Sequence, residues 1–189
     1  MAEISTDVLI SCTDENRRGG IKRIFIINKD DISSFTASTA DHSYTAVTTA
    51  TTSDVWYEIE GELEAKSYTS EGSRENGSVS YDTSIEVFVP KMEKVKAKGL
   101  NEYVQSCGLV AIIETYNKAT SDNIAFVVGW DSIMGKDAAL DAIGNEVIEG
   151  ALQGQNGYNL TLAGKQAEFV YEFVGSIETN TSGTVSFGS

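Results

Sequence analysis

Alternating apolar and polar positions run through most of this chain and predict a protein built mainly from β-strands. Residues 55–69 and 78–89 alternate most regularly, and a period of two residues is typical of a strand with one buried face. Shorter segments rich in β-branched and aromatic residues, separated by Gly, Asn, Asp and Ser, are predicted as further strands at 21–27, 43–50, 107–116, 124–131, 158–164 and 168–177.

The two most regular segments are expected to pair as one long hairpin over residues 55–89. Ile85, Val87 and Val89 would share its apolar face. Between the two segments lies SEGSRENG, residues 70–77, which has the composition of a loop and is predicted to form a mobile polar tip. Pro90, the only proline of the chain, then ends the second strand.

A single α-helix is predicted over about residues 92–106, where Met92, Val95, Leu100 and Tyr103 recur at helical spacing and charged or amide side chains occupy the other side. Strands that do not alternate with helices favour antiparallel sheets. The expected fold is therefore mainly β: one antiparallel β-sandwich or barrel domain with a flanking helix, residues 1–177, followed by a polar C-terminal arm, residues 178–189.

The charge of the chain narrows the kinds of partner that it can have. It carries 28 acidic and 14 basic residues, a net charge of −14, and the acids are spread along its length. Such a surface repels nucleic-acid phosphates and anionic lipids. The apolar runs are also far shorter than a membrane-spanning helix requires, so no membrane partner is expected.

No motif for catalysis, cofactor binding or metal binding is evident. His42, the single histidine, lies in a polar connection with no Ser-His-Asp set around it. Residues 131–137, DSIMGKD, lack the ligand spacing of a calcium loop, and Cys12 and Cys107 do not form a zinc-binding pattern. We therefore expect a protein that is not an enzyme and has no catalytic residue, cofactor or metal. A small hydrolase with a carboxylate pair stays an alternative, because sequence does not show which acids converge.

Four glutamates at every second position, Glu58, Glu60, Glu62 and Glu64, form the most unusual pattern in the chain. On a regular strand they would share one face at intervals of about 6.6 to 6.8 Å, and Glu86 in the following strand has the same parity. Like charges that face each other across a sheet cost stability. Three interpretations stay open: a solvated face, a surface that must not bind a polyanion, and a divalent-metal site. Even spacing on a flat strand disfavours the metal site, because the carboxylates do not converge on one ion.

Five segments of the chain occur in an order that resembles the tail tube proteins of tailed bacteriophages, in particular those of phages with Bacteroidetes-type hosts. They are RRGGIKRIFIINKDDISSFTA, SYTAVTTA, VWYEIEGELEAKSYTSE, VFVPKMEKVKAKGLNEYVQSCGLVAIIE and GQNGYNLTLAGKQ, which begin at residues 17, 43, 55, 87 and 154. The resemblance covers most of the chain.

The resemblance implies a structural virion protein of the phage tail that is assembled in the host cytoplasm. Tail tube proteins are β-sandwiches with a flanking helix, and they form hexameric rings whose inner sheets join into a continuous barrel. The rings stack through long loops and terminal arms into a tube that conducts the genome during ejection. The implied partners are further copies of the chain, other tail and neck proteins, and DNA that passes through without sequence-specific binding.

With this resemblance, the acidic row becomes a candidate lining of the tube lumen, made of Glu58, Glu60, Glu62, Glu64 and Glu86. An acidic lumen repels the DNA backbone over roughly 8 Å at physiological ionic strength. A basic lumen would instead bind phosphates and hold the DNA.

The predicted polar tip supplies the candidate contacts between rings, Glu71, Arg74, Glu75 and Asn76. The alternative function is that of a capsid or neck decoration protein, or another β-sandwich binding module of a virion. Formation of rings or tubes by the purified protein separates these two functions.

Overall fold

Strands dominate the computed structural model, which describes residues 20–38, 41–62, 64–118, 123–150, 154–181 and 183–188. Within these residues one α-helix, α1 (Lys94–Val104), and two 3-10 turns, η1 (Lys29–Asp31) and η2 (Lys136–Ala138), accompany the strands. The strands are β1 (Ile21–Asn28), β2 (Ile32–Ser38), β3 (Ser43–Thr49), β4 (Tyr57–Ile59), β5 (Lys66–Glu75), β6 (Ser78–Pro90), β7 (Leu109–Lys118), β8 (Asn123–Val128), β9 (Asp141–Ile148), β10 (Asn156–Gln166), β11 (Tyr171–Phe173), β12 (Ser176–Thr179) and β13 (Gly183–Ser186). The expectation of a mainly β fold with one flanking helix is confirmed.

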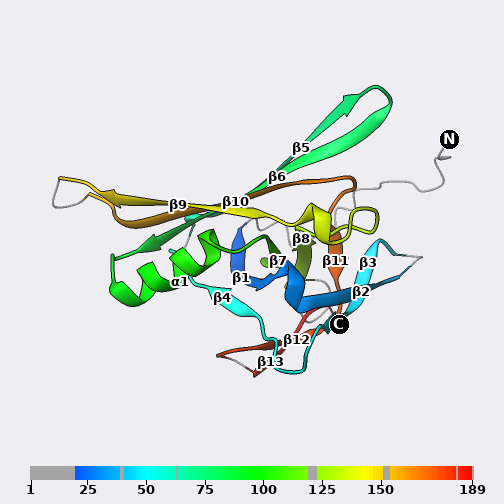
Figure 1. Ribbon diagram of the computed structural model, residues 1–189, viewed down its shortest axis with the longest axis horizontal. Helices are drawn as coiled ribbons and strands as arrows, with labels where there is room; N and C mark the ends of the chain where they lie inside the picture. Colours follow the sequence, from blue (N-terminus) through cyan, green and yellow to red (C-terminus); the bar gives the residue numbers. More distant parts are fainter. Residues whose placement is uncertain are drawn as a thin grey trace.

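Two large sheets form the body of the molecule (Figure 1). The seven-stranded sheet has the order β2-β3-β11-β8-β7-β1-β4, and the four-stranded sheet has the order β5-β6-β10-β9. All neighbouring strands in these sheets are antiparallel except β3 and β11. The predicted antiparallel sandwich is therefore present, with one parallel pair in its larger sheet.

The core lies on both faces of the seven-stranded sheet, and β1 shows why. Its residues alternate between two buried clusters: Ile24 and Ile26 face β6 and β10 of the four-stranded sheet, whereas Phe25 and Ile27 face the opposite side. Full burial of one such side chain contributes about 1.5 to 3 kcal/mol. The four consecutive apolar residues of β1, Ile24 to Ile27, are what a strand segment between two packed layers requires.

The second of these clusters is covered by the C-terminal segment, which differs from the polar arm predicted for residues 178–189. Strands β12 and β13 form a small hairpin, and Ile177, Val185 and Phe187 bury their side chains against the seven-stranded sheet. The Phe187 ring meets the Phe25 ring edge-on, with centroids 5.9 Å apart. Within the predicted arm, Val185 and Phe187 are enough to anchor the segment, so its polar composition was misleading.

Helix α1 flanks the four-stranded sheet, as predicted, within two residues of the expected ends. Met92, Ala97, Leu100 and Tyr103 pack against the core that the two sheets share. Val95, which was predicted on the apolar side, is instead 72% exposed. The helix has no fully buried residue, so it covers the edge of the core without completing it.

The hairpin predicted over residues 55–89 is wrong in its first half. Tyr57–Ile59 is β4, which pairs with β1 in the seven-stranded sheet, and only Lys66–Glu75 pairs with β6. The chain crosses between the two sheets at residues 60–65. A strand that changes sheets must bend, and the period of two cannot be carried through the bend.

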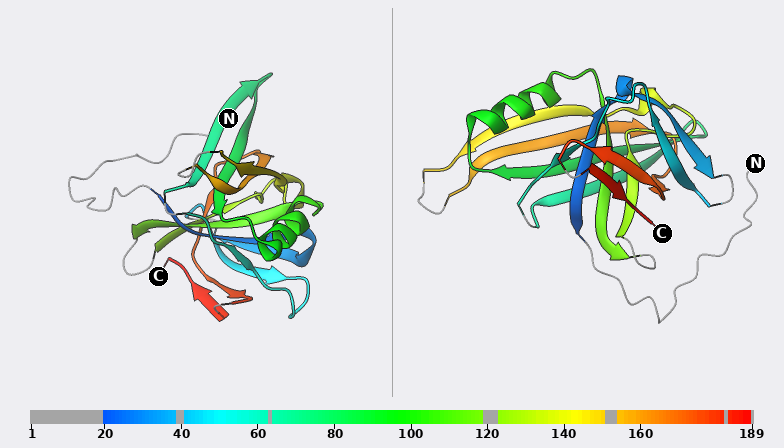
Figure 2. Two further views of the ribbon diagram at one scale, coloured as in Figure 1. Left: turned by 90° about the vertical axis from the view of Figure 1, so that its left-hand side faces the viewer. Right: turned by 90° about the horizontal axis from the view of Figure 1, so that it is seen from below.

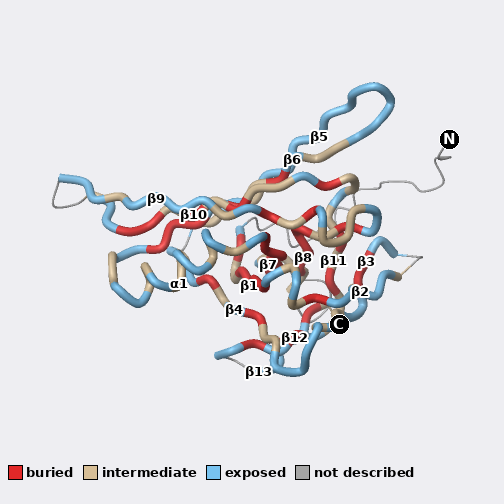
Figure 3. The backbone as a smooth tube through the Cα atoms, in the orientation of Figure 1, coloured by how far each residue is buried: buried red, intermediate tan, exposed pale blue. Residues whose placement is uncertain are grey.

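Two hairpins, β5–β6 and β9–β10, project from opposite ends of the four-stranded sheet (Figures 1 and 2). The far half of the β5–β6 hairpin is exposed along β5 and partly exposed along β6 (Figure 3). It closes with a two-residue turn, Asn76-Gly77, and both residues have positive φ, 49° and 84°. This is the type I′ geometry that an Asn-Gly pair favours. The predicted loop over residues 70–77 is thus two paired strands with a tight turn.

Candidate functional site

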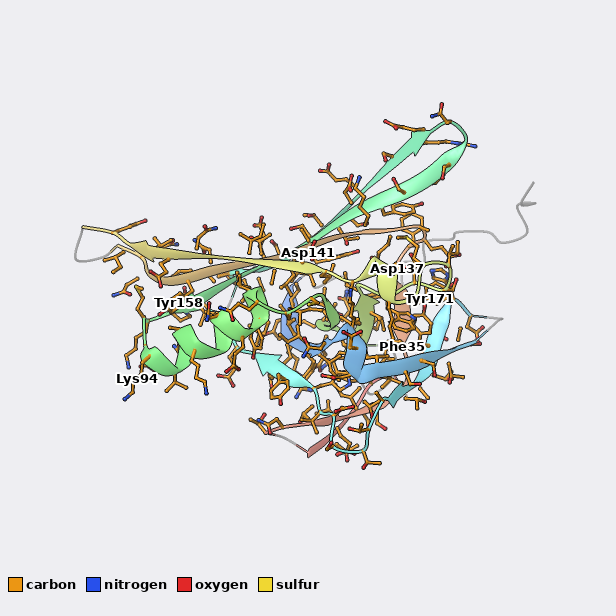
Figure 4. The ribbon with its side chains drawn as sticks, viewed as in Figure 1. Phe35, Lys94, Asp137, Asp141, Tyr158 and Tyr171 are labelled. Carbon is orange, nitrogen blue, oxygen red and sulfur yellow. The ribbon has the colours of Figure 1, made fainter. Side chains whose placement is uncertain are left out.

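The side of the four-stranded sheet that faces away from the core is the candidate functional surface, and we call it the outer face. Strand register assigns its residues, because cross-strand partners share a face. They are Ser67, Thr69, Glu71, Asp82, Ser84, Glu86, Phe88, Asp141, Ile143, Asn145, Asn159, Thr161, Ala163 and Lys165. Their alternate neighbours, such as Ile85, Leu160 and Leu162, lie in the core. Figure 4 shows the four-stranded sheet running along the top of the molecule, with Tyr158 on the side toward α1.

The outer face is polar and carries a net negative charge. Its ionisable side chains are the carboxylates of Glu71, Asp82, Glu86 and Asp141 and the ammonium of Lys165. Lys165 Nζ lies 3.2 Å from Asp82 Oδ1, but both side chains are more than half exposed, so the ion pair contributes little to stability. Ser, Thr and Asn occupy most of the remaining positions. Glu71 and Asp82 are cross-strand partners, whereas Glu86 and Asp141 stand on two other rows. Glu71, Asp82 and Lys165 line one open depression of about 430 Å³, which neither Glu86 nor Asp141 lines.

The predicted row of lumen glutamates is not a row. Glu58 belongs to β4, opposite Phe25 in the seven-stranded sheet, whereas Glu86 lies on β6 in the other sheet. Between them, Glu62 donates its backbone N–H to the carbonyl of Phe88 at 3.0 Å, and Glu64 adopts a positive φ of 66°. The change of sheet at residues 60–65 separates side chains that a regular strand would place on one face.

Glu58 has surroundings quite different from those of an open charged face. It is partly buried, and this burial raises the pKa of its carboxyl; Arg23 opposes the shift, and Glu60 adds to it. Lys66 lies between the two sheets, and its Nζ donates to the carbonyl of Lys22 at 2.7 Å. Burial lowers the pKa of the Lys66 ammonium, while Glu58 and Glu60 partly offset this. Glu58, Glu60 and Lys66 are therefore electrostatically coupled to one another at the junction of the sheets.

Two of the predicted lumen residues do meet. Glu64 and Glu86 line one open depression of about 450 Å³ beside the bend, together with Ser67, Asn159 and Thr161. Of the five candidates, the structure therefore brings only Glu64 and Glu86 to the same surface. Two acids of the outer face, Asp82 and Asp141, were not among the candidates. Asp82 had the right parity in the sequence, but Asp141 comes from a strand whose boundaries the sequence did not define.

The four-stranded sheet also ends in two open edges. Within the described part of the chain, β5 pairs only with β6, and β9 pairs only with β10. An edge strand presents unpaired N–H and C=O groups, and monomeric proteins usually protect it with charges, proline or a covering element. Strand β9 carries Asp141 and Glu146, and α1 lies against it near Gly144, but it also exposes Ile143, at 58%, and Ile148, at 72%. Exposed apolar side chains on an open edge are typical of a surface that another strand covers.

The four residues predicted to contact a neighbouring ring all lie on the projecting hairpin. Glu71 is opposite Asp82, Arg74 is opposite Val79, and Glu75 is opposite Ser78, while Asn76 is the first turn residue. All four are exposed. The hairpin presents them on a two-stranded ladder well away from the core (Figure 1).

His42, Asp131 and Cys107 were considered above for catalysis or metal binding, and the structure shows what each of them contacts. His42 is exposed and stacks on the Tyr171 ring, with centroids 3.7 Å apart. Asp131 is buried, and its carboxylate accepts backbone N–H groups of Ile133 and Ala167, at 2.9 and 2.7 Å, so it stabilises a turn. Cys107 is an exposed free thiol.

No group of three or more His, Cys, Asp or Glu side chains suited to a metal ion occurs among the residues that the structure describes. In the same residues, no helix combines the length and the apolar character that crossing a membrane requires.

No protein-family model, no curated protein and no solved structure matches the chain. What the protein does must therefore be inferred from its own residues and geometry.

Proposed function

We propose that this protein is a structural subunit of a phage tail tube, which assembles side by side into rings through the edges of its four-stranded sheet. The observation that carries the proposal is the pair of long open edges, β5 and β9, on opposite sides of one sheet. Backbone pairing between copies would satisfy their N–H and C=O groups and remove both edges at once.

The directions of the strands favour a closed ring. Each neighbouring pair in the order β5-β6-β10-β9 is antiparallel, so β5 and β9 run in opposite directions. A rotation about a ring axis close to the strand direction preserves these directions, and β9 of one copy then meets β5 of the next in antiparallel order. Pairing of this kind continues from copy to copy until the sheet closes into a barrel.

Exposed apolar side chains supply a driving force for this contact. Ile143 and Ile148 on β9 would lose contact with water against a neighbouring strand, and covering apolar surface contributes about 25 cal/mol per Å². The contact is heterologous, because it joins two different edges, and a heterologous contact forms rings when the rotation closes. The resemblance to tail tubes then suggests six copies in the ring.

In such a ring we place the outer face toward the lumen. Its carboxylates outnumber its single ammonium group by four to one, and the whole chain has a net charge of −14. A surface with this charge repels DNA phosphates and releases few counterions, so DNA would pass without being held. The proposed lumen residues are thus Glu71, Asp82, Glu86 and Asp141, and Glu64 joins them at the rim of the depression.

Negative-stain electron microscopy of the concentrated protein tests the proposal. We expect hollow rings or tubes from the wild type. The variant Ile143→Lys places a charge on the β9 edge and should prevent ring closure. Ile133→Lys is its matched control, because Ile133 is also mostly exposed, at 68%, and lies in the Asp131–Gly135 turn away from both edges. The control should assemble like the wild type.

Particles that stay monomeric at all concentrations would instead favour a decoration or binding module of a virion. Equal assembly by the Ile143→Lys and Ile133→Lys variants would show that β9 is not a subunit contact.

A further inference from the structure

A second charged surface stands out because the rest of the chain is so acidic. Four lysines, Lys91, Lys94, Lys96 and Lys98, lie within eight residues, out of 14 basic residues in the whole chain. We call them the basic patch. Glu93 is the single acidic residue among them. The stretch therefore keeps a net positive charge in a protein whose net charge is −14.

Three lysines of the basic patch are exposed and Lys96 is half-buried, and two of the four lie at an unfavourable end of a helix. The side chains of Lys91 and Lys98 are 74% and 81% exposed, and they form solvated ion pairs with Glu93 and, at 3.7 Å, with Glu102, which are weak at this exposure. Lys96 Nζ donates a hydrogen bond to the carbonyl of Pro90 at 2.5 Å. Lys94 and Lys96 occupy the first turn of α1, which has no acidic residue and no side-chain cap. Positive charges are unfavourable there, because the helix dipole is positive at that end. Lysines at the N-terminus of α1 therefore do not stabilise the helix. Residues that break a local stability rule are expected at functional surfaces, so these lysines indicate a contact with a partner.

The basic patch and the projecting hairpin lie at opposite ends of the molecule. Figure 4 shows Lys94 at the far end of the long axis from the β5–β6 tip. The far half of this hairpin carries the carboxylates of Glu71, Glu75 and Asp82 against one guanidinium, that of Arg74; Asp82 is also paired with Lys165 of β10. Glu71, Arg74, Glu75 and Asp82 are all exposed. An acidic hairpin therefore projects from one end, and a largely exposed basic surface lies at the other.

We propose that the basic patch of one copy docks the β5–β6 hairpin of a second copy, so that successive rings stack head to tail. The partner is another copy of this chain, and the inference rests on the proposed ring. Opposite charges at opposite ends give a heterologous contact that does not close, which is the geometry of an extending filament. The hairpin can reach a neighbour because a ladder of six residues per strand extends about 20 Å.

Complementary charge also fixes the polarity of stacking. Two copies that met tip to tip would oppose acids with acids, and two that met patch to patch would oppose lysines with lysines. Like charges across an interface are unfavourable. The charges thus favour one direction of growth, in which every ring presents its hairpins to the basic patches of the next ring.

The double variant Lys94→Glu/Lys96→Glu tests this inference. Negative charges in the first turn should stabilise α1. The melting temperature of the variant protein should therefore not fall below that of the wild type, and unfolding could not explain a loss of stacking. At low ionic strength we expect rings without tubes, with at least about a tenfold rise in the protein concentration at which half of the protein sediments as tubes. Adding Glu71→Lys/Glu75→Lys should restore tubes.

The matched control is Lys29→Glu/Lys136→Glu, which changes the net charge equally on the two 3-10 turns, outside both surfaces. It should stack like the wild type. Tubes from Lys94→Glu/Lys96→Glu at the wild-type concentration would overturn the docking, and so would failure of the compensating reversal to restore them. Either result leaves ring formation intact as a separate observation, whereas a wild type that forms no rings at all would overturn both proposals.

Discussion

Replacing Glu114 with glutamine should weaken the fold at neutral pH and leave it nearly unchanged at low pH. Glu114 lies on β7 with only 3% of its side chain exposed. Its carboxylate accepts hydrogen bonds from Lys22 Nζ at 2.9 Å, from Arg23 Nε and from Asn123 Nδ2. Glutamine keeps the shape but loses the charge that holds the two cations.

The magnitude follows from this geometry. Removing one partner of a fully buried ion pair costs about 3 to 5 kcal/mol. Lys22 and Arg23 keep 38% and 28% of their side chains exposed, so both can turn toward water, and we expect a loss of about 2 kcal/mol. For a chain of this length that lowers the melting temperature by about 4 to 8 °C.

The pH dependence gives a sharper test. Burial raises the pKa of Glu114, but the hydrogen bonds from Arg23, Asn123 and Lys22 outweigh it and leave the pKa below its usual value. A carboxylate with a lowered folded-state pKa stabilises the fold fully above its unfolded pKa, about 4.3. That stability is lost as the pH falls through the folded-state pKa. The wild type and the Glu114→Gln variant should therefore approach each other in stability as the pH falls from about 4.3 through the lower folded-state pKa.

Urea unfolding of dilute, monomeric protein at about pH 7 and pH 3 measures the difference. Glu102→Gln is the control, because Glu102 is exposed and lies 3.7 Å from Lys98, and it should change the unfolding free energy by less than about 0.5 kcal/mol. The reasoning fails if the Glu114→Gln loss is the same at both pH values, or if it is no larger than that of the control.

Two further predictions concern the sheet and its outer face. A side chain at Gly157 would place Cβ 2.3 Å from the carbonyl oxygen of Val89, so Gly157→Ala should lower the unfolding free energy by at least about 2 kcal/mol in thermal denaturation. Gly99→Ala, which meets no atom within 4 Å on α1, should raise it by up to about 1 kcal/mol. Tubes of the Glu86→Lys/Asp141→Lys variant should bind DNA in a co-sedimentation assay and release it as salt rises. Wild-type tubes should not, and equal behaviour of the two would remove the role proposed for the outer face.

Several parts of this protein follow from local sequence. The strand alternation of residues 78–89 and the period of residues 92–106 predicted β6 and α1, and Pro90 marks the end of β6 in the structure. These predictions succeed because burial of one face leaves a period of two or 3.6 in the chain itself. The charge of the chain is likewise a property of composition alone.

The arrangement of the acidic residues depended on the tertiary structure. Residues 55–69 alternate without interruption, yet the chain changes sheets within them, and Glu58 and Glu86 end up in different layers. Nothing local distinguishes a continuous strand from one that bends between two sheets, because both bury alternate residues. Asp141 and Ile143 joined the outer face only through the pairing of β9 with β10. The composition thus determined that the protein is acidic and mainly β, whereas long-range pairing decided which acids share a surface and which edges stay open, because register is set by contacts between segments far apart in sequence.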